Sequence, residues 1–257
     1  MRPCLQPALS VRQASFGGPA PLICVPLVAG SLPELLDQAQ YAHAQGPDVV
    51  EWRADFYDDL SADAVSAALT QLREALPREL LLFTVRASTE GGARPIAPHT
   101  RSQVILGAIG SGRIDLVDLE LATGPEAIQT VRSAARARGV RLVLSCHDFQ
   151  QTPPNGALLS AISQMVRDGA DIAKVACMPQ DPSDVLRLLD VTLTARRMFP
   201  TTGLVTMAMG PLGVVSRATG FLYGSDMSFA AGKASSAPGQ IPIAELRTLF
   251  EAFGRHA

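Results

Sequence analysis

The chain has 257 residues, of which 47% are hydrophobic, and its formal net charge is -2 at pH 7. This length fits one large domain or two small ones, and single α/β barrels commonly reach it. The charges are mixed in sign along the chain and form no long block of one sign, so we expect neither a nucleic-acid partner nor an anionic membrane surface.

The cysteines and the apolar runs of the sequence indicate the cellular compartment that we expect for the protein. The four cysteines are widely separated and form no CxxC pair, which is typical of free thiols in a reduced, cytoplasmic protein. Residues 1–21 lack the apolar core and cleavage site of a signal peptide. The longest uncharged run, 198–216, is broken by prolines and glycines, and its apolar part is too short to span a bilayer.

After residues 1–21, apolar strand-like runs alternate with runs of helical period. Ser31 and Glu34 resemble a capping box, Ser61 is a candidate N-cap, and Gly139 a candidate helix end. The predicted strands cover 22–28, 48–55, 79–86, 114–121, 140–145, the apolar part of 171–180, 202–209 and 227–229. The predicted helices cover about 31–44, 61–76, a stretch around 104–109, 125–138, a stretch around 158–166, 181–198, 212–223 and a stretch around 243–253.

Strict alternation of this kind predicts parallel strands joined by right-handed crossovers. Eight such units favour a closed (β/α)8 barrel over an open doubly wound sheet, and no GxGxxG follows the first strand. We therefore expect a single (β/α)8 barrel domain over 1–257, with 1–21 as an N-terminal extension.

The stretch from Asp171 to Gln180 places one lysine, Lys174, in the middle of a short apolar strand. A strand buried on both faces has no cheap place for an unpaired ammonium group. Lys174 therefore either extends to solvent or pairs with a carboxylate, or its amine is desolvated and reactive.

Polar residues recur where the predicted strands end. In a barrel these ends form one mouth, where active sites lie. Each residue alone has a structural explanation, such as an ion pair or a hydrogen-bonded turn, but together they come from six or seven strands. They are Glu51, Arg53, Arg86, Glu90, Asp118, Glu120, His147, Lys174, Arg217 and the loop 231–240.

These residue types form a coherent chemical set. Desolvation and nearby arginines lower the pKa of a lysine, which gives a neutral amine able to form an imine with a ketone. A histidine nearby is the natural base for the carbon acid beside that imine, and a carboxylate such as Glu90 can hold its tautomer. Arginines bind a carboxylate in bidentate fashion.

At these residues the chain resembles type I 3-dehydroquinate dehydratase, an enzyme of the shikimate pathway of aromatic amino-acid biosynthesis. Six ordered motifs between Leu22 and Ile243 carry the resemblance. They are Glu51-Trp-Arg-Ala-Asp55, Phe83-Thr-Val-Arg86 with Glu90-Gly-Gly, Ser145-Cys-His-Asp-Phe149, 171–180, Ser216-Arg217 and Ser236-Ala-Pro-Gly-Gln240.

The resemblance implies a cofactor-free and metal-free homodimeric (β/α)8 barrel whose N-terminal segment closes the barrel floor. It implies that Lys174 forms a Schiff base with 3-dehydroquinate, that His147 is the general acid and base, and that Glu90 orients His147. Arg217 matches the residue that pairs with the substrate carboxylate. The other implied substrate contacts are Glu51, Arg53, Arg86, Ser236 and Gln240, with Met209, Phe149 and Phe229 as apolar walls.

Three other readings stay open from the sequence. The first is a class I aldolase-type barrel lyase that acts on another carboxylated ketone. The second is a divalent-metal enzyme that uses the carboxylates and His147 as ligands, although a metal does not need Lys174 and arginines would repel it. The third is a barrel that binds a small anion or a partner protein without catalysis.

Overall fold

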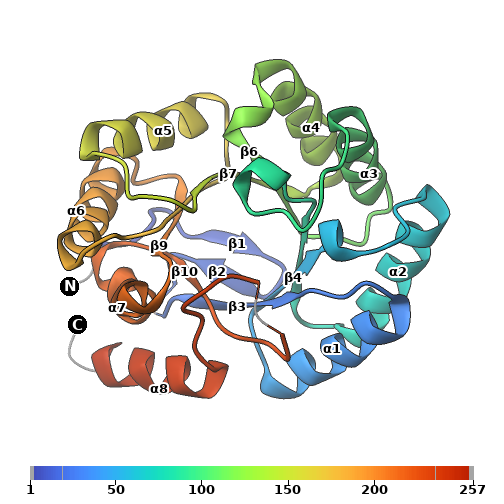
Figure 1. Ribbon diagram of the computed structural model, residues 1–257, viewed down its shortest axis with the longest axis horizontal. Helices are drawn as coiled ribbons and strands as arrows, with labels where there is room; N and C mark the ends of the chain where they lie inside the picture. The colour runs from blue at the N-terminus through green and yellow to red at the C-terminus, as the bar shows by residue number, and fades with distance from the viewer. Residues whose placement is uncertain (1–2, 19, 235, 255–257) are drawn as a thin grey trace.

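Eight short apolar strands pair side by side in parallel to form the wall of a barrel (Figure 1). The computed structural model describes residues 3–18, 20–234 and 236–254. The order of hydrogen-bonded strands is β10-β3-β4-β5-β6-β7-β8-β9, which confirms the predicted fold. Within the described residues the strands are β3 (Leu22–Leu27), β4 (Val49–Arg53), β5 (Leu80–Thr84), β6 (Leu116–Glu120), β7 (Arg141–Asp148), β8 (Ile172–Cys177), β9 (Gly203–Ala208) and β10 (Met227–Phe229).

The seam between β9 and β10 is bridged by the residues that precede β10. The backbone N–H of Asp226 donates to the carbonyl of Leu204 at 2.7 Å, and its Oδ2 accepts from the Leu204 N–H at 2.8 Å. Ser225 Oγ accepts from the Thr206 N–H at 3.1 Å. Backbone and side-chain bonds from this short segment therefore join the two ends of the sheet.

Amphipathic helices surround the strands and turn their apolar stripes toward the sheet (Figure 1). Ser61 caps its helix as predicted, because its side chain accepts from the Ala64 N–H at 3.3 Å. The capping box at Ser31 is wrong: its side chain makes no capping bond, and Glu34 accepts from the Gly30 N–H instead. The described helices are α1 (Leu32–Gln45), α2 (Ala62–Ala75), α3 (Pro98–Gly110), α4 (Pro125–Arg138), α5 (Asn155–Arg167), α6 (Pro182–Met198), α7 (Val214–Thr219) and α8 (Ile243–Gly254).

Two predicted elements differ from the structure. The strand predicted to end at Ser145 continues to Asp148 as β7, because its last residues still pair with β8. The helix predicted over 212–223 is divided into η4 (Pro211–Gly213), α7 and η5 (Gly220–Tyr223). No helix in the part of the chain that is described is long and apolar enough to cross a bilayer.

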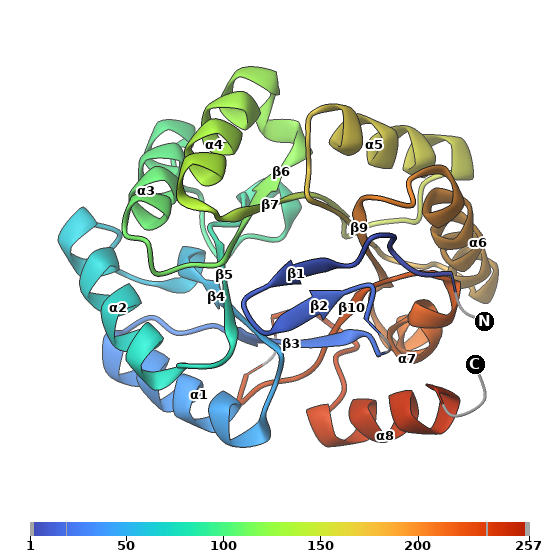
Figure 2. The same ribbon diagram turned by 180° about the vertical axis from the view of Figure 1, so that it is seen from behind.

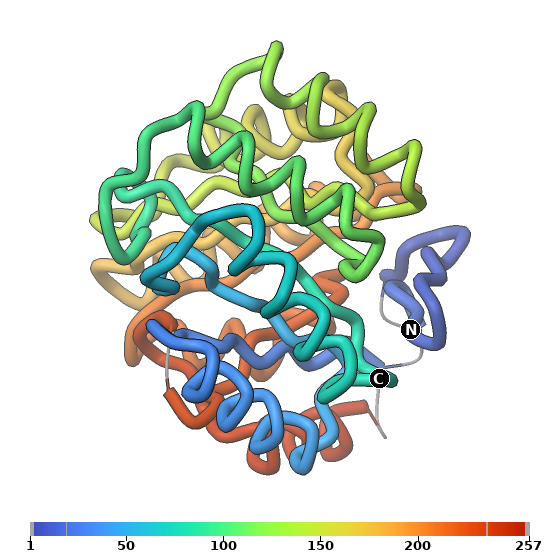
Figure 3. Tube along the Cα trace, turned by 90° about the vertical axis from the view of Figure 1, so that its right-hand side faces the viewer, coloured from blue at the N-terminus to red at the C-terminus, as the bar shows by residue number. Residues whose placement is uncertain are grey.

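The N-terminal segment forms a hairpin of β1 (Leu9–Val11) and β2 (Ala14–Phe16). It lies across one end of the barrel, as the view from behind and the side view show (Figures 2 and 3). Phe16 and Leu5 are buried in one cluster with the first inward-facing residues of the strands, such as Leu22 and Val49. The prediction that this segment closes the barrel floor is confirmed for the described residues. Residues 1, 2, 19, 235 and 255–257 of the expected domain lie outside them.

The interior of the barrel changes from apolar to polar along the strands. Near the floor, Val49, Leu116 and Ile172 are buried inside it. Successive inward positions are two residues apart in a strand, so the next inward residues are Glu51, Asp118 and Lys174. The hairpin and the apolar layer thus lie beneath a group of charges at the carboxyl ends of the strands.

Candidate active site

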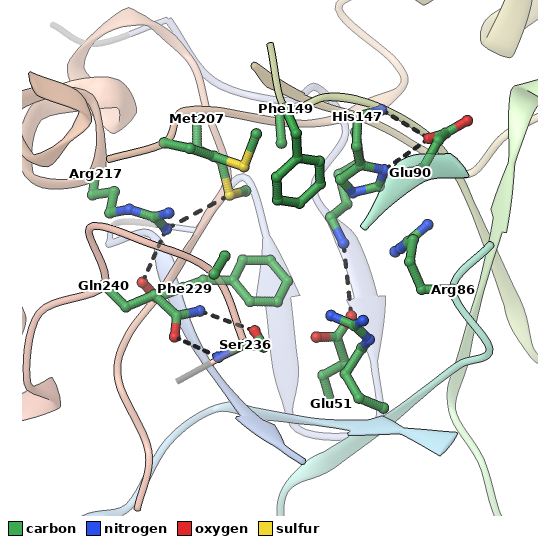
Figure 4. A pocket seen from close by; sticks show the side chains of 15 residues that line it. Glu51, Arg86, Glu90, His147, Phe149, Met207, Arg217, Phe229, Ser236 and Gln240 are labelled. Atoms are coloured by element: carbon green, nitrogen blue, oxygen red, sulfur yellow. Dashed lines mark hydrogen bonds and ion pairs between the residues drawn. The ribbon is translucent and has the colours of Figure 1, made fainter. Parts of the chain in front are cut away.

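A pocket opens at the carboxyl ends of the strands, and all twelve predicted site residues line it (Figure 4). Three further lining residues, Ala176, Met207 and Ala237, are small or apolar and carried no sequence signal of their own. The predicted twelve are Glu51, Arg53, Arg86, Glu90, His147, Phe149, Lys174, Met209, Arg217, Phe229, Ser236 and Gln240.

Lys174 lies in the middle of β8, between β7 and β9, and only 4% of its surface is exposed. Its Nζ donates to Asp118 Oδ2 at 2.9 Å and lies 3.7 Å from Glu51 Oε1. Nζ is also 4.7 Å from the centroid of the Phe229 ring. The amine is therefore buried and paired with a carboxylate rather than extended to solvent, and its reactivity stays a prediction.

Asp118 joins the lysine to Arg86. Arg86 Nη1 donates to Asp118 Oδ1 at 2.9 Å, its Nη2 lies 2.9 Å from Oδ2, and Ser145 Oγ donates to Oδ1 at 2.5 Å. Burial alone would raise the pKa of Asp118, but Arg86 and Lys174 outweigh it and hold that pKa well below its usual value. Asp118 is therefore a fixed negative charge beside the amine.

Glu120 lies two residues further along β6 and accepts hydrogen bonds from Arg86, Ala87 and Arg101. Its Oε1 accepts from Arg86 Nη1 and from the Ala87 N–H, both at 2.9 Å. Its Oε2 accepts from Arg101 Nη2, and Arg101 Nε donates to the Val85 carbonyl at 3.0 Å. Burial lowers the pKa of Arg86, but Asp118 and Glu120 together raise it above its ordinary value.

His147 faces Glu90, which lies in the short helix η2 (Ser88–Glu90) (Figure 4). His147 Nδ1 is 3.0 Å from Glu90 Oε2, and the His147 backbone N–H donates to the same oxygen at 2.8 Å. Burial, Arg86 and Lys174 lower the pKa of His147 well below its usual value. Burial and the charge of Glu120 raise the pKa of Glu90 to about 7. The imidazole is therefore neutral at pH 7, and its Nε2 is left for a ligand.

Arg53 is held in a fixed direction by Asp55. Its Nε and Nη2 donate to the two oxygens of Asp55 at 2.8 and 2.7 Å, and Nη2 also donates to the Gly91 carbonyl at 3.1 Å. Asp55 accepts further bonds from the N–H groups of Arg86 and Ala93 at 3.2 and 2.9 Å. The sequence motif around Glu51 thus fixes the loop that carries Glu90.

Arg217 lies on the opposite side of the pocket, beside Met207 (Figure 4). Only 1% of its surface is exposed, and among the described residues it forms no ion pair with a carboxylate. It donates to the carbonyls of Phe229 and Pro238 at 3.3 and 3.2 Å, and its buried Nε has no hydrogen-bond partner. Burial lowers its pKa to about 10, so it remains charged at pH 7.

Residues 236–240, which follow β10, line the pocket from the side of that strand. Ser236 and Gln240 bond each other, through Gln240 Nε2 to Ser236 Oγ and the Ser236 N–H to Gln240 Oε1, both at 3.2 Å. Gly210 N–H donates to the Pro238 carbonyl at 3.1 Å. At Gly239, with φ +81°, a Cβ would lie 2.2 Å from the Gly210 carbonyl oxygen. The loop therefore approaches Gly210 as closely as only glycine permits.

Apolar side chains form the rest of the wall. Met209 and Phe229 are buried, whereas Phe149 is 37% exposed at the mouth. The Phe149 ring packs so closely on Gly91 that a Cβ there would lie 2.3 Å from it. A planar or ring-shaped ligand would contact these apolar faces while its polar groups meet the charged ones.

The carboxylates at the mouth are engaged with cations rather than grouped around an empty centre. Among the described residues no group of three or more His, Cys, Asp or Glu side chains is placed to hold a metal ion. Asp118 and Glu120 were recognised in the sequence as strand-end residues, but their partners were not. Arg101 and Asp55 were missed as part of the site.

Comparisons of sequence and of fold relate the chain to known proteins. The type I 3-dehydroquinase family model matches residues 23–257. A 3-dehydroquinate dehydratase of Bacillus velezensis is 39% identical, and the alignment covers 97% of this chain and 99% of the relative. A 3-dehydroquinate dehydratase of Klebsiella pneumoniae is 40% identical, and the alignment covers 95% of this chain and 98% of the relative. The crystal structure of 3-dehydroquinate dehydratase from Geobacillus kaustophilus matches with a TM-score of 0.97 and 42% identity over all of both chains. The type I 3-dehydroquinate dehydratase of Clostridium difficile was solved with covalently modified comenic acid. It matches with a TM-score of 0.93 and 33% identity, over 97% of this chain and 98% of that one.

Proposed function

Since the chain belongs to the type I 3-dehydroquinase family, we propose that it dehydrates 3-dehydroquinate to 3-dehydroshikimate in the shikimate pathway, through an imine on Lys174. The observation that carries the imine is the buried amine of Lys174 in one pocket with a neutral imidazole and an arginine that lacks a carboxylate. The covalent ligand of the Clostridium difficile relative supports covalent chemistry in this family.

The reaction begins when Lys174 loses its proton and Nζ attacks the C3 ketone. Water leaves the resulting carbinolamine, and the nitrogen becomes a protonated imine. This cation accepts the electron pair of the neighbouring C2–H bond when the proton is removed. His147 takes that proton at Nε2, because its Nδ1 is directed at Glu90.

The enamine then expels the C1 hydroxyl, which takes the proton from His147 and leaves as water. The electron pair that had moved to nitrogen returns to form the new C1–C2 double bond and the protonated imine. Hydrolysis of that imine releases 3-dehydroshikimate and restores the amine of Lys174. One water is consumed and two are released, so the net change is the loss of one water.

The remaining predicted residues bind the substrate in this proposal. Arg217 pairs with the carboxylate, because it is a buried cation directed into the pocket without an anion. Glu51, Arg53 and Arg86 meet the hydroxyl and carbonyl oxygens, and Ser236 with Gln240 bonds the ligand from the loop. Met209, Phe149 and Phe229 contact the ring. The homodimer and the cytoplasmic location remain predictions from the family.

Borohydride reduction in the presence of 3-dehydroquinate tests the imine directly. The sequence contains two lysines, Lys174 and Lys233, so peptide mapping has a simple readout. We expect the reduced adduct on Lys174 in the wild type and in Lys233→Ala, and neither adduct nor turnover in Lys174→Ala. His147→Ala should lose roughly 10²- to 10⁴-fold in kcat and let the adduct accumulate.

Two outcomes would contradict the proposal. Substantial turnover in a folded Lys174→Ala variant would exclude the imine mechanism. Trapping with another carboxylated ketone but not with 3-dehydroquinate would instead support an aldolase-type lyase, and a panel of ketones in the same assay distinguishes the two.

A further inference from the structure

Arg101 is the charged residue on the buried stripe of α3. The other buried residues of that helix are Val104, Ile105, Ala108 and Ile109. Arg101 is 8% exposed and does not line the pocket. A buried arginine on an otherwise apolar stripe costs free energy unless its charge is compensated, so its partners indicate what it does.

The partners of Arg101 connect it to the reacting lysine. Through Glu120 it reaches Arg86, and through Asp118 it reaches Lys174. The charges alternate along this chain of five side chains, from the outer helix to the amine. Arg101 also donates to the Val85 carbonyl, which fixes the end of β5 directly before Arg86.

Without Arg101, Glu120 would retain only Arg86 and the Ala87 N–H as donors. Arg86 would then be the one cation left on Glu120, while it also shares Asp118 with Lys174 and faces the substrate pocket. A buried carboxylate that loses one of its cations is strongly destabilising and draws the remaining cation toward itself. The position of Arg86 therefore depends on a residue that never meets the substrate.

We propose that Arg101 is a positioning residue for the dehydration, which by neutralising Glu120 keeps Arg86 directed at the pocket and keeps the Glu90–His147 pair in its working protonation state. This inference rests on the proposed function. It assigns a role in the reaction to a helix that lies outside the barrel wall.

The charged groups around Glu90 and His147 determine how tightly this pair binds protons. Glu90 is faced by Glu120, Arg86, Asp118, His147 and Cys146, and His147 is faced also by Lys174 and Arg53. Burial and Glu120 raise the pKa of Glu90, and burial and Arg86 lower that of His147. Loss of the positive charge of Arg101 leaves Glu120 less compensated, so both groups bind protons more tightly.

The test is the pH profile of kcat/KM for Arg101→Met beside the wild type. The acidic limb reports the proton that the Glu90–His147 pair must release as a unit. We expect Arg101→Met to move that limb upward by about one pH unit, the effect of one elementary charge at roughly 10 Å in a partly buried site. At pH 7 kcat/KM should fall about 10- to 100-fold, as misplacement of a binding group commonly does.

Matched variants separate this role from a structural one. Arg101→Lys, which keeps the charge, should leave the limb at the wild-type pH even if its melting temperature falls. Glu120→Gln should move the limb downward, and it tests the inference if Arg101→Met does not fold. The double variant Arg101→Met/Glu120→Gln should return the limb toward the wild-type position. An unshifted limb in both single variants would overturn the inference.

The proposed function is checked separately in the same samples. If wild-type protein is trapped by borohydride on Lys174 while the limb stays fixed in both single variants, the inference on Arg101 fails and the imine mechanism stands. If the wild type is neither trapped nor active, the proposed function fails first.

Discussion

Two buried arginines in one pocket should respond in opposite ways to the loss of their charge. Among the described residues Arg217 forms no ion pair with a carboxylate and its Nε has no hydrogen-bond partner, whereas Arg86 pairs with Asp118 and Glu120. We predict that Arg217→Met impairs substrate binding without destabilising the fold, and that Arg86→Met destabilises it. The comparison tests whether Arg217 is kept charged for a ligand rather than for the structure.

The size of the effect follows from the pKa of Arg217. Burial lowers that pKa from its ordinary value to about 10, which corresponds to roughly 3 kcal/mol against the charged, folded state at pH 7. Arg217→Met removes this cost but also loses hydrogen bonds to the Phe229 and Pro238 carbonyls, each worth about 1 kcal/mol. The free energy of unfolding should therefore be unchanged or rise by about 1 kcal/mol.

Although Arg217→Met should not lower the free energy of unfolding, it should weaken substrate binding. Truncating one partner of a buried charge pair costs about 2–5 kcal/mol, so kcat/KM should fall between about 30-fold and a few thousand-fold. Arg86→Met leaves two buried carboxylates short of a cation and should lower the free energy of unfolding by about 3–5 kcal/mol. Urea denaturation and steady-state kinetics measure both quantities. If Arg217→Met were as unstable as Arg86→Met, the assignment of Arg217 to a ligand carboxylate would be wrong.

Two further predictions concern Glu90 and the loop over the pocket. The carboxyl of Glu90 releases its proton near pH 7 in the folded chain but near its ordinary value of 4.5 when unfolded, so between these values the folded state holds more protons and stability falls as pH rises. Glu90→Gln should remove that contribution, and urea denaturation should show its stability relative to wild type rising by up to about 3 kcal/mol from pH 4.5 to 8; a pH-independent difference would contradict this. Gly239→Ala places a Cβ 2.2 Å from the Gly210 carbonyl oxygen and should lower kcat/KM by about tenfold or more through a displaced loop. The control Gly112→Ala, also at positive φ but with no atom within 4 Å, should keep wild-type kinetics, and equal kinetics in the two variants would refute the steric reasoning.

The sequence predicted the barrel and the pocket because both depend on periodic patterns. The period of two in the strands placed Glu51 with Arg53 and Asp118 with Glu120 on shared faces, and alternation with helices directed all strand ends to one mouth. The seam beside β10 was not predictable in the same way. It depends on Asp226 and Ser225, whose bonds to β9 carry no local signal.

Ion-pair partners were also out of reach, since pairing is set by the cross-barrel geometry. Lys174 and Asp118 are 56 positions apart in the sequence, and nothing local separates Asp118 from Glu120 as the partner of the amine. Arg101 did leave a signal, however. It lies three residues before Val104 and four before Ile105, on the stripe that covers the sheet, so a charged residue at a core-facing helical position could have been recognised as a candidate for the site.

The pairing of Lys174 with Asp118 is compatible with the proposed imine because of where the positive charge resides. An ammonium ion and a protonated imine both carry that charge on the same nitrogen, so a carboxylate 2.9 Å away stabilises both. Asp118 destabilises only the short-lived neutral amine that attacks the ketone. It stabilises the protonated imine, the cation that withdraws electrons from C2. The described carboxylates thus pair with the lysine and its neighbouring arginines, and under the proposed function Arg217 pairs with the anion of the substrate. In the proposed reaction this charge pattern favours a substrate that carries a carboxylate.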